Sequence, residues 1–572
     1  MSTPPSADAA GAGAGGDSIP SAPDSGSEGF NLGTVHERVS AVVADRQCVV
    51  QGDRSWTYRE ITERSRRLAR LLHDHGLGVR TERHQLEGHE SGQDHLGLYL
   101  YNGNEYIEGM LGAYKARVAP FNVNYRYVEE ELLYLLSDAK PRALLYHASF
   151  APVLERVLPQ LEGLELLLQV ADSSGNPLLE GAVDYEEALE SVPPELPPTE
   201  PSPDDLYIIY TGGTTGMPKA VLWRQHDIFH AAMGGRIFGT WDLLETYDQL
   251  VERLLPTDDV RVLSIPPLMH AAAQWACFYY FALGATVVFP KNVHNLDPAE
   301  IWRTVERERV IGLTVVGDSM ARPLVEELEN GSYDTSSVMA LGSGGAILSE
   351  GIKQRFLAVL PNLIISDVAG ASETGAQMGT MSTSGSVQTG RFTAGPGTTV
   401  LDEDMTKELS AGDESIGWLA QSGAVPLGYL GDPQKTARTF PVVGSVRYSI
   451  PGDRARLLAD GQIELLGRDS VTINSGGEKI FAEEVEQAIV HHPDVVDVVV
   501  AGRPSERWGQ EVVALVQVVE GSQVTPEELI EEAGKHLARY KLPKAVGFEK
   551  QIVRSPSGKA DYRWAKRQAL EV

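Results

Sequence analysis

The sequence predicts an α/β protein with a large N-terminal body of several subdomains, in which helices pack on parallel-rich sheets, and a small mobile α+β C-terminal domain. Segments typical of strands and of helices alternate from residue 96 onward, which implies a mostly parallel sheet with helices on both faces. The chain has 572 residues, enough for several domain-sized units. Near residue 467 the pattern changes to a compact α+β unit of about a hundred residues, a usual domain size.

Changes in composition divide the chain into three parts. Residues 1–32 are expected to be a disordered tail, because Ala, Gly, Ser and Pro dominate them and little apolar surface is available to offset the entropy of ordering. The body is expected to span residues 33–467, and the mobile C-terminal domain residues 468–572. Within the body, the proline-dense acidic stretch 191–205 is typical of a linker and ends just before an apolar strand at 206–211.

The elements of the body follow from short apolar runs and the turn residues between them. Expected strands lie at 96–103 (ending in a turn), 142–147 and 165–170, and expected helices at 104–116, 131–139 and 153–161. Similar helix–strand units recur at 301–317 and 352–370. In the C-terminal domain we expect helices at 482–492 and 526–540 and strands at 495–502 and 511–519.

The apolar run 271–290 is long enough to be tested as a membrane span. Gly284 divides it into a helix-length part and a β-branched part that Pro290 closes. A buried helix, a glycine stop and a short buried strand explain this pattern better than a span. The sequence therefore predicts no integral membrane segment.

The charge of the chain limits its partners. Acidic residues outnumber basic residues by 79 to 49, giving a formal charge of −30. Nucleic acids and anionic membranes both require a basic field, so neither is an expected partner. The two cysteines, Cys48 and Cys277, permit no disulfide framework, which fits a cytoplasmic protein.

The most informative motif, Tyr210 to Lys219 (YTGGTTGMPK), follows the strand at 206–211. Glycines let backbone amides point at phosphate oxygens, threonine hydroxyls add donors, and the lysine adds a positive charge. The spacing differs from that of the loop that ends in Gly-Lys-Ser/Thr. A flexible turn is the alternative. The residues expected to hold phosphate are Thr211, Gly212, Gly213, Thr214, Thr215, Gly216 and Lys219.

This decapeptide closely resembles the phosphate loop of the adenylate-forming superfamily, which comprises acyl-CoA ligases, nonribosomal adenylation domains and beetle luciferases. The resemblance covers roughly residues 35–570. The sequence of its motifs is still more similar to actinobacterial ligases that activate fatty acids or steroid side-chain acids. It implies that a carboxylate attacks the α-phosphate of ATP to form an acyl-adenylate, and that the thiol of CoA then captures the acyl group. ATP, CoA and Mg²⁺ are the implied ligands besides a small carboxylic acid.

The resemblance also assigns roles to residues. Glu373 matches the magnesium ligand, Asp453 the carboxylate that holds the ribose hydroxyls, and Lys559 the lysine that the C-terminal domain inserts into the active site. Thr211, Lys219, Glu373 and Lys559 are thus the implied catalytic residues. Ala369 stands where relatives often have an aromatic that stacks on adenine. The remaining implied contacts to nucleotide or thiol are Gly344, Gly345, Ala346, Asp367, Ala369, Gly370, Ala371, Ser372, Arg468, Ser475, Gly476 and Gly477.

The substrate pocket is expected where the apolar run begins. His270 matches the mouth of the acyl pocket in related ligases, and no aspartate for a substrate amine occurs between Pro266 and Thr286, which favours an apolar acid. Expected neighbours of His270 are Gln274, Trp275, Gly317 and Asp318. Steroid side-chain, medium-chain and long-chain acids all remain open.

Alternative functions are an acyl-AMP ligase that loads a free acyl carrier protein, a luciferase-like oxidase and a non-catalytic nucleotide-binding protein. The hinge is expected at Ser470, two positions after Arg468. A homo-oligomer is compatible with the sequence.

Overall fold

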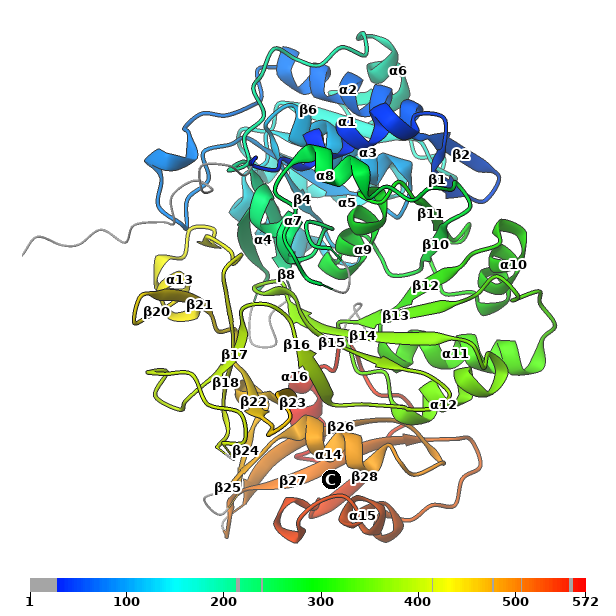
Figure 1. The fold of residues 1–572 in the computed structure, drawn as a ribbon, viewed down its shortest axis with the longest axis vertical. Helices are drawn as coiled ribbons and strands as arrows, with labels where there is room; N and C mark the ends of the chain where they lie inside the picture. The colour runs from blue at the N-terminus through cyan, green and yellow to red at the C-terminus, as the bar shows by residue number, and fades with distance from the viewer. Residues whose placement is uncertain are drawn as a thin grey trace, which may run out of the picture.

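The protein is described from a computed structural model that covers residues 28–211, 217–237, 240–413, 415–475, 478–505, 507–554 and 559–572. Figure 1 shows its units stacked along the long axis, from the blue and cyan N-terminal unit at the top to the orange and red C-terminal unit at the bottom. Several predicted features lie outside the described residues, namely the tail over 1–27, Gly212, Gly213, Thr214, Thr215 and Gly216 of the phosphate loop, and Gly476 and Gly477.

The N-terminal unit contains a five-stranded sheet that is parallel throughout, with the order β4–β3–β5–β6–β7. Its strands are β3 (His95–Tyr99), β4 (Ala119–Asn122), β5 (Ala143–His147), β6 (Leu166–Val170) and β7 (Ala182–Asp184). The helix α3 (Asn104–Lys115) is buried along its whole length. The alternation of strand and helix predicted from residue 96 is confirmed here.

A larger sheet of 15 strands changes character along its width. From β1 to β14 the neighbouring strands are parallel, whereas from β14 onward they are antiparallel. The strands of the parallel part are β1 (Gln47–Gln51), β11 (Thr286–Phe289), β10 (Arg261–Ser264), β12 (Gly312–Val315), β13 (Ala340–Gly344) and β14 (Ile364–Ala371), with β2 (Arg54–Thr57) at the edge. The antiparallel part holds β15 (Gly375–Ser382), β16 (Arg391–Ala394), β17 (Thr398–Leu401), β18 (Gly417–Ser422), β20 (Val442–Val443), β21 (Val446–Ser449), β22 (Asp453–Leu457) and β23 (Gln462–Arg468). Ligands of open α/β sheets bind at the carboxyl ends of such parallel strands, so the ends of β13 and β14 are a natural place for a site.

A three-stranded antiparallel sheet carries the predicted phosphate loop. Its strands are β8 (Leu206–Thr211), β9 (Lys219–Arg224) and β19 (Gly428–Tyr429). Thr211 pairs with Lys219 in the β8–β9 register, so the two ends of the loop face each other.

Helices cover both large sheets (Figure 1). They are α1 (Leu32–Val43), α2 (Tyr58–Asp74), α4 (Glu129–Ala139), α5 (Ala151–Val157), α6 (Tyr185–Glu190), α7 (Gln225–Ala231), α8 (Tyr247–Glu252), α9 (Ala271–Phe281), α10 (Pro298–Glu308), α11 (Gly317–Asn330), α12 (Glu350–Val359) and α13 (Pro433–Thr439). The predicted order in the apolar run is confirmed, because α9 is followed by Gly284 at φ +71° and then by the buried strand β11. No helix of the described residues has the length and apolarity to cross a membrane.

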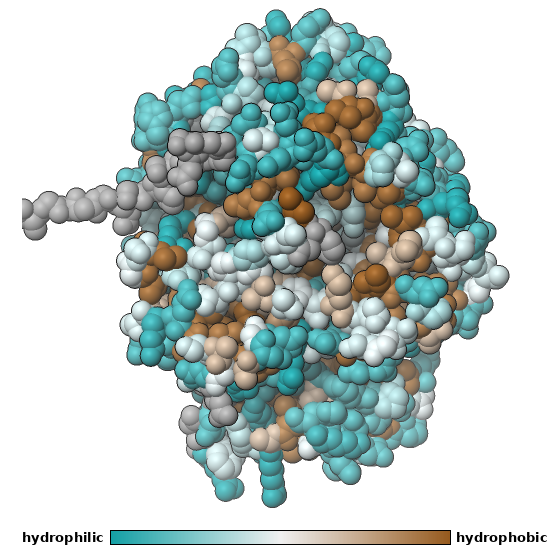
Figure 2. All heavy atoms as spheres, in the orientation of Figure 1, coloured by the Kyte–Doolittle hydropathy of each residue, from teal (hydrophilic) through white to brown (hydrophobic). Residues whose placement is uncertain are grey.

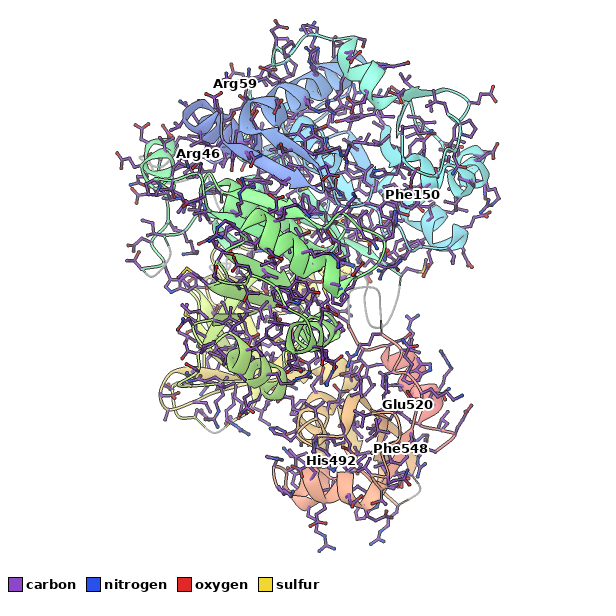
Figure 3. All side chains as sticks on the ribbon, turned by 90° about the vertical axis from the view of Figure 1, so that its right-hand side faces the viewer. Arg46, Arg59, Phe150, His492, Glu520 and Phe548 are labelled. Carbon is purple, nitrogen blue, oxygen red and sulfur yellow. The ribbon has the colours of Figure 1, made fainter. Side chains whose placement is uncertain are left out.

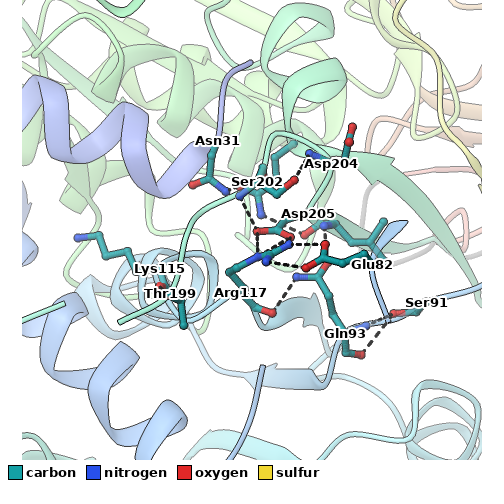
Figure 4. A network of polar contacts seen from close by, with 12 residues as sticks. Asn31, Glu82, Ser91, Gln93, Lys115, Arg117, Thr199, Ser202, Asp204 and Asp205 are labelled. Atoms are coloured by element: carbon teal, nitrogen blue, oxygen red, sulfur yellow. Dashed lines mark hydrogen bonds and ion pairs between the residues drawn. The ribbon is translucent and has the colours of Figure 1, made fainter. Parts of the chain in front are cut away.

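Two segments are more firmly held than their composition indicates. The last residues of the predicted tail pack into the body, since Phe30 is fully buried and α1 begins at Leu32. The proline-rich stretch 191–205 is anchored as well (Figure 4): the guanidinium of Arg117 donates to Asp205 at 2.9 Å, and the Thr199 hydroxyl donates to a backbone carbonyl of α3 at 3.3 Å. This stretch therefore leads into β8 from a fixed position.

The C-terminal unit has its own core and a five-stranded sheet. Its elements are β24 (Ile473–Ser475), β25 (Glu478–Ile480), α14 (Ala482–Ile489), β26 (Val495–Ser505), β27 (Gly509–Val518), α15 (Pro526–Gly534), β28 (Ala545–Phe548) and α16 (Tyr562–Gln568). The helix predicted over 526–540 is too long, since α15 ends at Gly534. Its buried apolar residues, Leu529 and Ala533, end there, and glycine is a poor helix former.

The two ends of the molecule are well separated. Figure 3 places Arg46, Arg59 and Phe150 in the upper unit and His492, Glu520 and Phe548 in the lower one. Figure 2 shows hydrophilic residues over much of the upper and lower parts of one face of the molecule and several hydrophobic patches between them.

Candidate active site

Glu373 lies in the turn between β14 and β15, and three side chains from other elements fix this turn. The Tyr429 hydroxyl donates to Glu373 Oε1 at 2.7 Å, and the Ser449 hydroxyl donates to the Glu373 carbonyl at 2.6 Å. The Trp223 indole donates to the carbonyl of Ser372 at 2.8 Å. Burial and the neighbouring Glu373 carboxylate raise the pKa of Tyr429, so the hydroxyl remains a donor. The carboxylate is therefore held in place before any ligand arrives.

Lys219, at the start of β9, points toward the N-terminus of α13. Its Nζ lies 3.5 Å from Oδ2 of Asp432. Asp432 caps α13, because its Oδ1 accepts the backbone N–H of Lys435 at 2.9 Å. That hydrogen bond and the Lys219 charge lower the pKa of Asp432, so Lys219 faces an ionised carboxylate.

Asp453 and Arg468 face each other across the β22–β23 pair. Arg468 Nε lies 3.4 Å from Asp453 Oδ1, and this carboxylate is the main cause of the raised pKa of Arg468. A second ion pair lies beside the first, because Arg454 Nε, in β22, is 2.9 Å from Oδ1 of Asp469, which directly follows β23. Arg454 is buried, and its guanidinium lies 3.5 Å from the centroid of the Trp418 ring. Asp453, which is predicted to bind the ribose, thus lies in a hairpin that two ion pairs stabilise.

Lys559 reaches this hairpin from the C-terminal unit. Desolvation by the surrounding protein lowers the pKa of Lys559, although part of the side chain reaches solvent, and the charge of Arg468 lowers it further. The carboxylates of Glu373 and Asp453 act in the opposite direction. The charges of Glu373, Asp453 and Arg468 therefore act on Lys559 across the boundary between the C-terminal unit and the body.

His270 directly precedes α9 and lies within range of the charge of Lys559. Burial lowers the pKa of His270 to about 3, and the charges of Lys559 and Arg126 contribute to this shift. The imidazole is therefore neutral at physiological pH. Its Nε2 atom is buried and has no hydrogen-bond partner among the described residues.

Other predicted site residues have partners inside the protein. The amide of Gln274 accepts from the Tyr207 hydroxyl at 2.8 Å and donates to the carbonyl of Leu268 at 2.8 Å. The Trp275 indole donates to the same Tyr207 hydroxyl at 3.2 Å. These side chains therefore anchor α9 behind the expected pocket.

A second group of predicted residues lies in β13 and β14, at the ends of these strands and at the start of α11. The Asp367 carboxylate forms an ion pair with the buried Lys353. Asp318 accepts the backbone N–H of Ser349 at 2.7 Å, and Gly317 has φ +54°. The other members of the group follow the strands: Gly344 ends β13, Gly345 follows at φ +83° and precedes Ala346, and Ala369, Gly370 and Ala371 form the end of β14. Ala369 packs beside the core cluster of Met378 and Phe392. Ser475 ends β24 in the C-terminal unit.

Sequence reasoning missed three residues of this site: Tyr429, Asp432 and Lys435. An Asp directly before a Pro is a typical start of a helix, so the capping role of Asp432 was open to prediction. The hydrogen bond from Tyr429 to Glu373 joins positions 56 residues apart, and no local pattern indicates it.

Comparison with known proteins shows the family of the chain. Residues 36–430 match the family model of the AMP-binding enzyme, and residues 484–559 match that of the AMP-binding enzyme C-terminal domain. The medium-chain acyl-CoA ligase Mig of Mycobacterium avium is 58% identical over 541 residues, which cover 95% of this chain and 98% of that protein. The 3-oxocholest-4-en-26-oate–CoA ligase of Rhodococcus rhodochrous is 39% identical over 553 residues, covering 94% and 96%.

Solved structures share the fold at lower identity. The anthranilate CoA ligase AuaEII in complex with anthranoyl-AMP has a TM-score of 0.78 at 19% identity, covering 95% of this chain and 98% of that one. ATP-bound MatB from Rhodopseudomonas palustris has a TM-score of 0.77 at 22% identity, covering 94% and 99%. Both confirm the predicted architecture of a large α/β body with a small C-terminal domain. The chain therefore belongs to the AMP-binding enzyme family.

Proposed function

We propose that the protein is an AMP-forming acyl-CoA ligase, which uses ATP to join a carboxylic acid to CoA. The observation that carries this proposal is that Lys559, which comes from the C-terminal unit, lies within range of the charges of Glu373, Asp453 and Arg468 in the body. A lysine near the carboxylates expected to bind the nucleotide, and near the expected acyl site, is suited to activating the carboxylate of an acid substrate. Relatives named as acyl-CoA ligases over nearly the whole chain support the same reaction.

ATP is proposed to bind across the ends of β8, β14 and β22. Thr211 and Lys219 flank the loop that would receive the triphosphate. The Asp453 carboxylate can accept both hydroxyls of a ribose, and Arg468 holds that carboxylate by its ion pair. The turn at 370–372 and the end of β13 would border the adenine.

Glu373 fits a magnesium ion. Mg²⁺ in nucleotide sites is usually held by one or two carboxylates together with phosphate oxygens, and Glu373 offers a carboxylate that Tyr429 orients through one oxygen only. When bound, the ion would neutralise charge on the departing pyrophosphate. Magnesium dependence is thus part of the proposal.

In the first half-reaction, a carboxylate oxygen of the acid forms a bond to the α-phosphorus and the bond to the β-phosphate bridge breaks. Lys559 would hold the acid and an α-phosphate oxygen together and stabilise the charge that both bring. The neutral His270 and the apolar residues of α9 offer no charge to an amine and would suit an uncharged chain.

In the second half-reaction, the C-terminal domain is proposed to turn and admit CoA. We propose a body at 33–467 and a mobile domain at 468–572, with the turn at Ser470. The predicted body ends within β23, and Asp469, directly after that strand, forms an ion pair with Arg454. Ser475, at the end of β24, would line the thiol path together with its neighbours. Rotation of one domain lets a single site serve both steps.

A medium-chain fatty acid is the proposed substrate class, since the relative with 58% identity is named for it. The decisive experiment measures AMP release with ATP, Mg²⁺ and CoA for octanoate, palmitate and a steroid side-chain acid. Octanoate is expected to give the highest kcat/KM. No CoA-dependent AMP release with any of these acids would contradict the proposed function. Homo-oligomerisation and a cytoplasmic location stay predictions.

A further inference from the structure

Lys435 lies on the phosphate side of the proposed site, and none of the roles above uses it. We propose that Lys435 is a second phosphate-binding lysine, which contacts the β- and γ-phosphates of ATP and stabilises pyrophosphate as it leaves. This inference rests on the proposed function. It adds a binding residue to the first half-reaction and predicts no role in the second.

The backbone of Lys435 is held rigidly. Asp432 caps α13 through the backbone N–H of Lys435 at 2.9 Å, and Pro433 occupies the first position of the helix. The same Asp432 carboxylate lies 3.5 Å from the ammonium of Lys219, which flanks the phosphate loop. One carboxylate therefore ties both lysines to the same end of the helix.

The side chain of Lys435 is directed by an aromatic ring. Its ammonium lies 3.9 Å from the centroid of the Tyr429 ring, close enough for a cation–π contact. The hydroxyl of that ring donates to Glu373 Oε1 at 2.7 Å. A single tyrosine thus places the ammonium of Lys435 on its face and the proposed magnesium ligand at its edge.

Within the described part of the chain, the charge of Lys435 has no direct carboxylate partner. Among the described residues, no carboxylate oxygen lies within 4.0 Å of its ammonium. Partial burial lowers the pKa of Lys435, and Lys219 lowers it further, whereas Glu373 raises it. A partly desolvated ammonium beside a second lysine gains most from a multivalent anion, because the anion offsets the repulsion between the two cations.

The reaction creates such an anion. As the acid's oxygen bonds to the α-phosphorus, the electron pair of the breaking α–β bridge passes to the pyrophosphate, and no proton has to move. Charge grows on the leaving group, so a fixed cation stabilises the transition state more than the ground state. Lys435 is placed for this effect together with Lys219.

The test compares two half-reactions in the full-length protein. Octanoate-dependent ATP–pyrophosphate exchange measures the first, and capture of supplied octanoyl-AMP by CoA measures the second. The variants are Lys435→Met, Lys435→Arg and the matched control Arg438→Met, which removes an exposed positive charge from the same helix. In the exchange assay, Lys435→Met should lower kcat/KM for ATP roughly ten- to hundredfold, because the loss of one charged hydrogen bond costs about that much. The variant should also bind pyrophosphate more weakly.

Three comparisons decide the outcome. CoA capture by Lys435→Met should stay within about twofold of wild type, Lys435→Arg should recover much of the exchange, and Arg438→Met should leave exchange unchanged. Equal losses in both half-reactions, or an equal loss in Arg438→Met, would overturn the proposal, since the effect would then be structural or a general field effect. Absence of exchange in the wild-type protein would instead count against the proposed function itself.

Discussion

Replacing Lys559 by alanine removes the cation that the C-terminal unit brings to the site. We expect octanoyl-adenylate formation to be lost while CoA capture from supplied octanoyl-AMP is retained. The reason is the position of Lys559, which lies close enough to Glu373, Asp453 and Arg468 for their charges to act on it, and reaches the site from the other domain.

The size of the loss follows from these surroundings. One preorganised electrostatic group is worth about 10²–10³ in kcat, or about 2.7–4 kcal/mol. Arg468 remains in the variant as a second cation, and the Lys559 side chain is partly open to solvent, which screens its charge. We therefore expect a loss near a hundredfold in the first half-reaction and less than threefold in the second.

The pH dependence provides an independent check. The pKa of Lys559 lies below the ordinary value of 10.5, because desolvation and Arg468 disfavour the charged form. The protonated lysine is present below this lowered pKa and is lost as the pH rises through it. Pyrophosphate exchange should therefore fall at a lower alkaline pH than an ordinary lysine predicts, and in Lys559→Arg, which stays charged, this fall should vanish.

The assay is octanoate-dependent ATP–pyrophosphate exchange, with Lys566→Ala, an exposed lysine of α16, as the matched control. Exchange in Lys559→Ala within about threefold of wild type would refute the reasoning, because the proposed electrostatic role leaves no room for so small an effect. Loss of both half-reactions would refute it as well, since a misplaced domain would then explain the result.

Three further predictions concern the frame of the site. Tyr429→Phe removes the hydroxyl that orients Glu373 and should raise the Mg²⁺ concentration needed for half-maximal exchange about five- to tenfold, at ~1 kcal/mol for one hydrogen bond; an unchanged Mg²⁺ titration would contradict it. Gly317→Ala places a Cβ 2.5 Å from a carbonyl oxygen at φ +54° and should cost about 1–3 kcal/mol of unfolding free energy in denaturant titrations, whereas Gly351→Ala, with nothing within 4 Å, should not. Burial raises the pKa of Glu483 to about 7, so its contribution to stability is fully present below pH 4.5 and is lost as the pH rises through about 7. The melting temperature should therefore fall over this pH range, and Glu483→Gln should reduce that fall. An unchanged dependence of the melting temperature on pH in Glu483→Gln would disprove the assignment.

Much of the fold could be read from local patterns. The strand–helix alternation after residue 96 and the order of α9, Gly284 and β11 follow from apolar periodicity and from a glycine that adopts a positive φ. The end of α15 at Gly534 could not be placed, because the polar residues that follow are as compatible with a helix as with the turn that forms.

The candidate site divides in the same way. The loop after β8 and the carboxylate Glu373 could be proposed from the sequence because phosphate and metal chemistry demand particular residue types at short spacings. The role of Lys559 came only from the family resemblance, and all three assignments stay predictions. Gln274 stays a predicted neighbour of the pocket, and its hydrogen bonds to the Tyr207 hydroxyl and the Leu268 carbonyl could not be predicted, because no local pattern indicates them.

The sequence by itself therefore determined the fold class, the order of the elements and the family, since each depends on residues close together in the chain. The tertiary structure alone decided that Lys559 comes within range of the charges of Glu373 and Asp453, that Tyr429 donates to the Glu373 carboxylate, and that Lys435 lies on the ring of that tyrosine. Contacts of this kind join residues from separate strands and domains. They exist only after the β14–β15 turn, the start of α13 and the C-terminal unit have packed together, and no spacing along the chain encodes that packing.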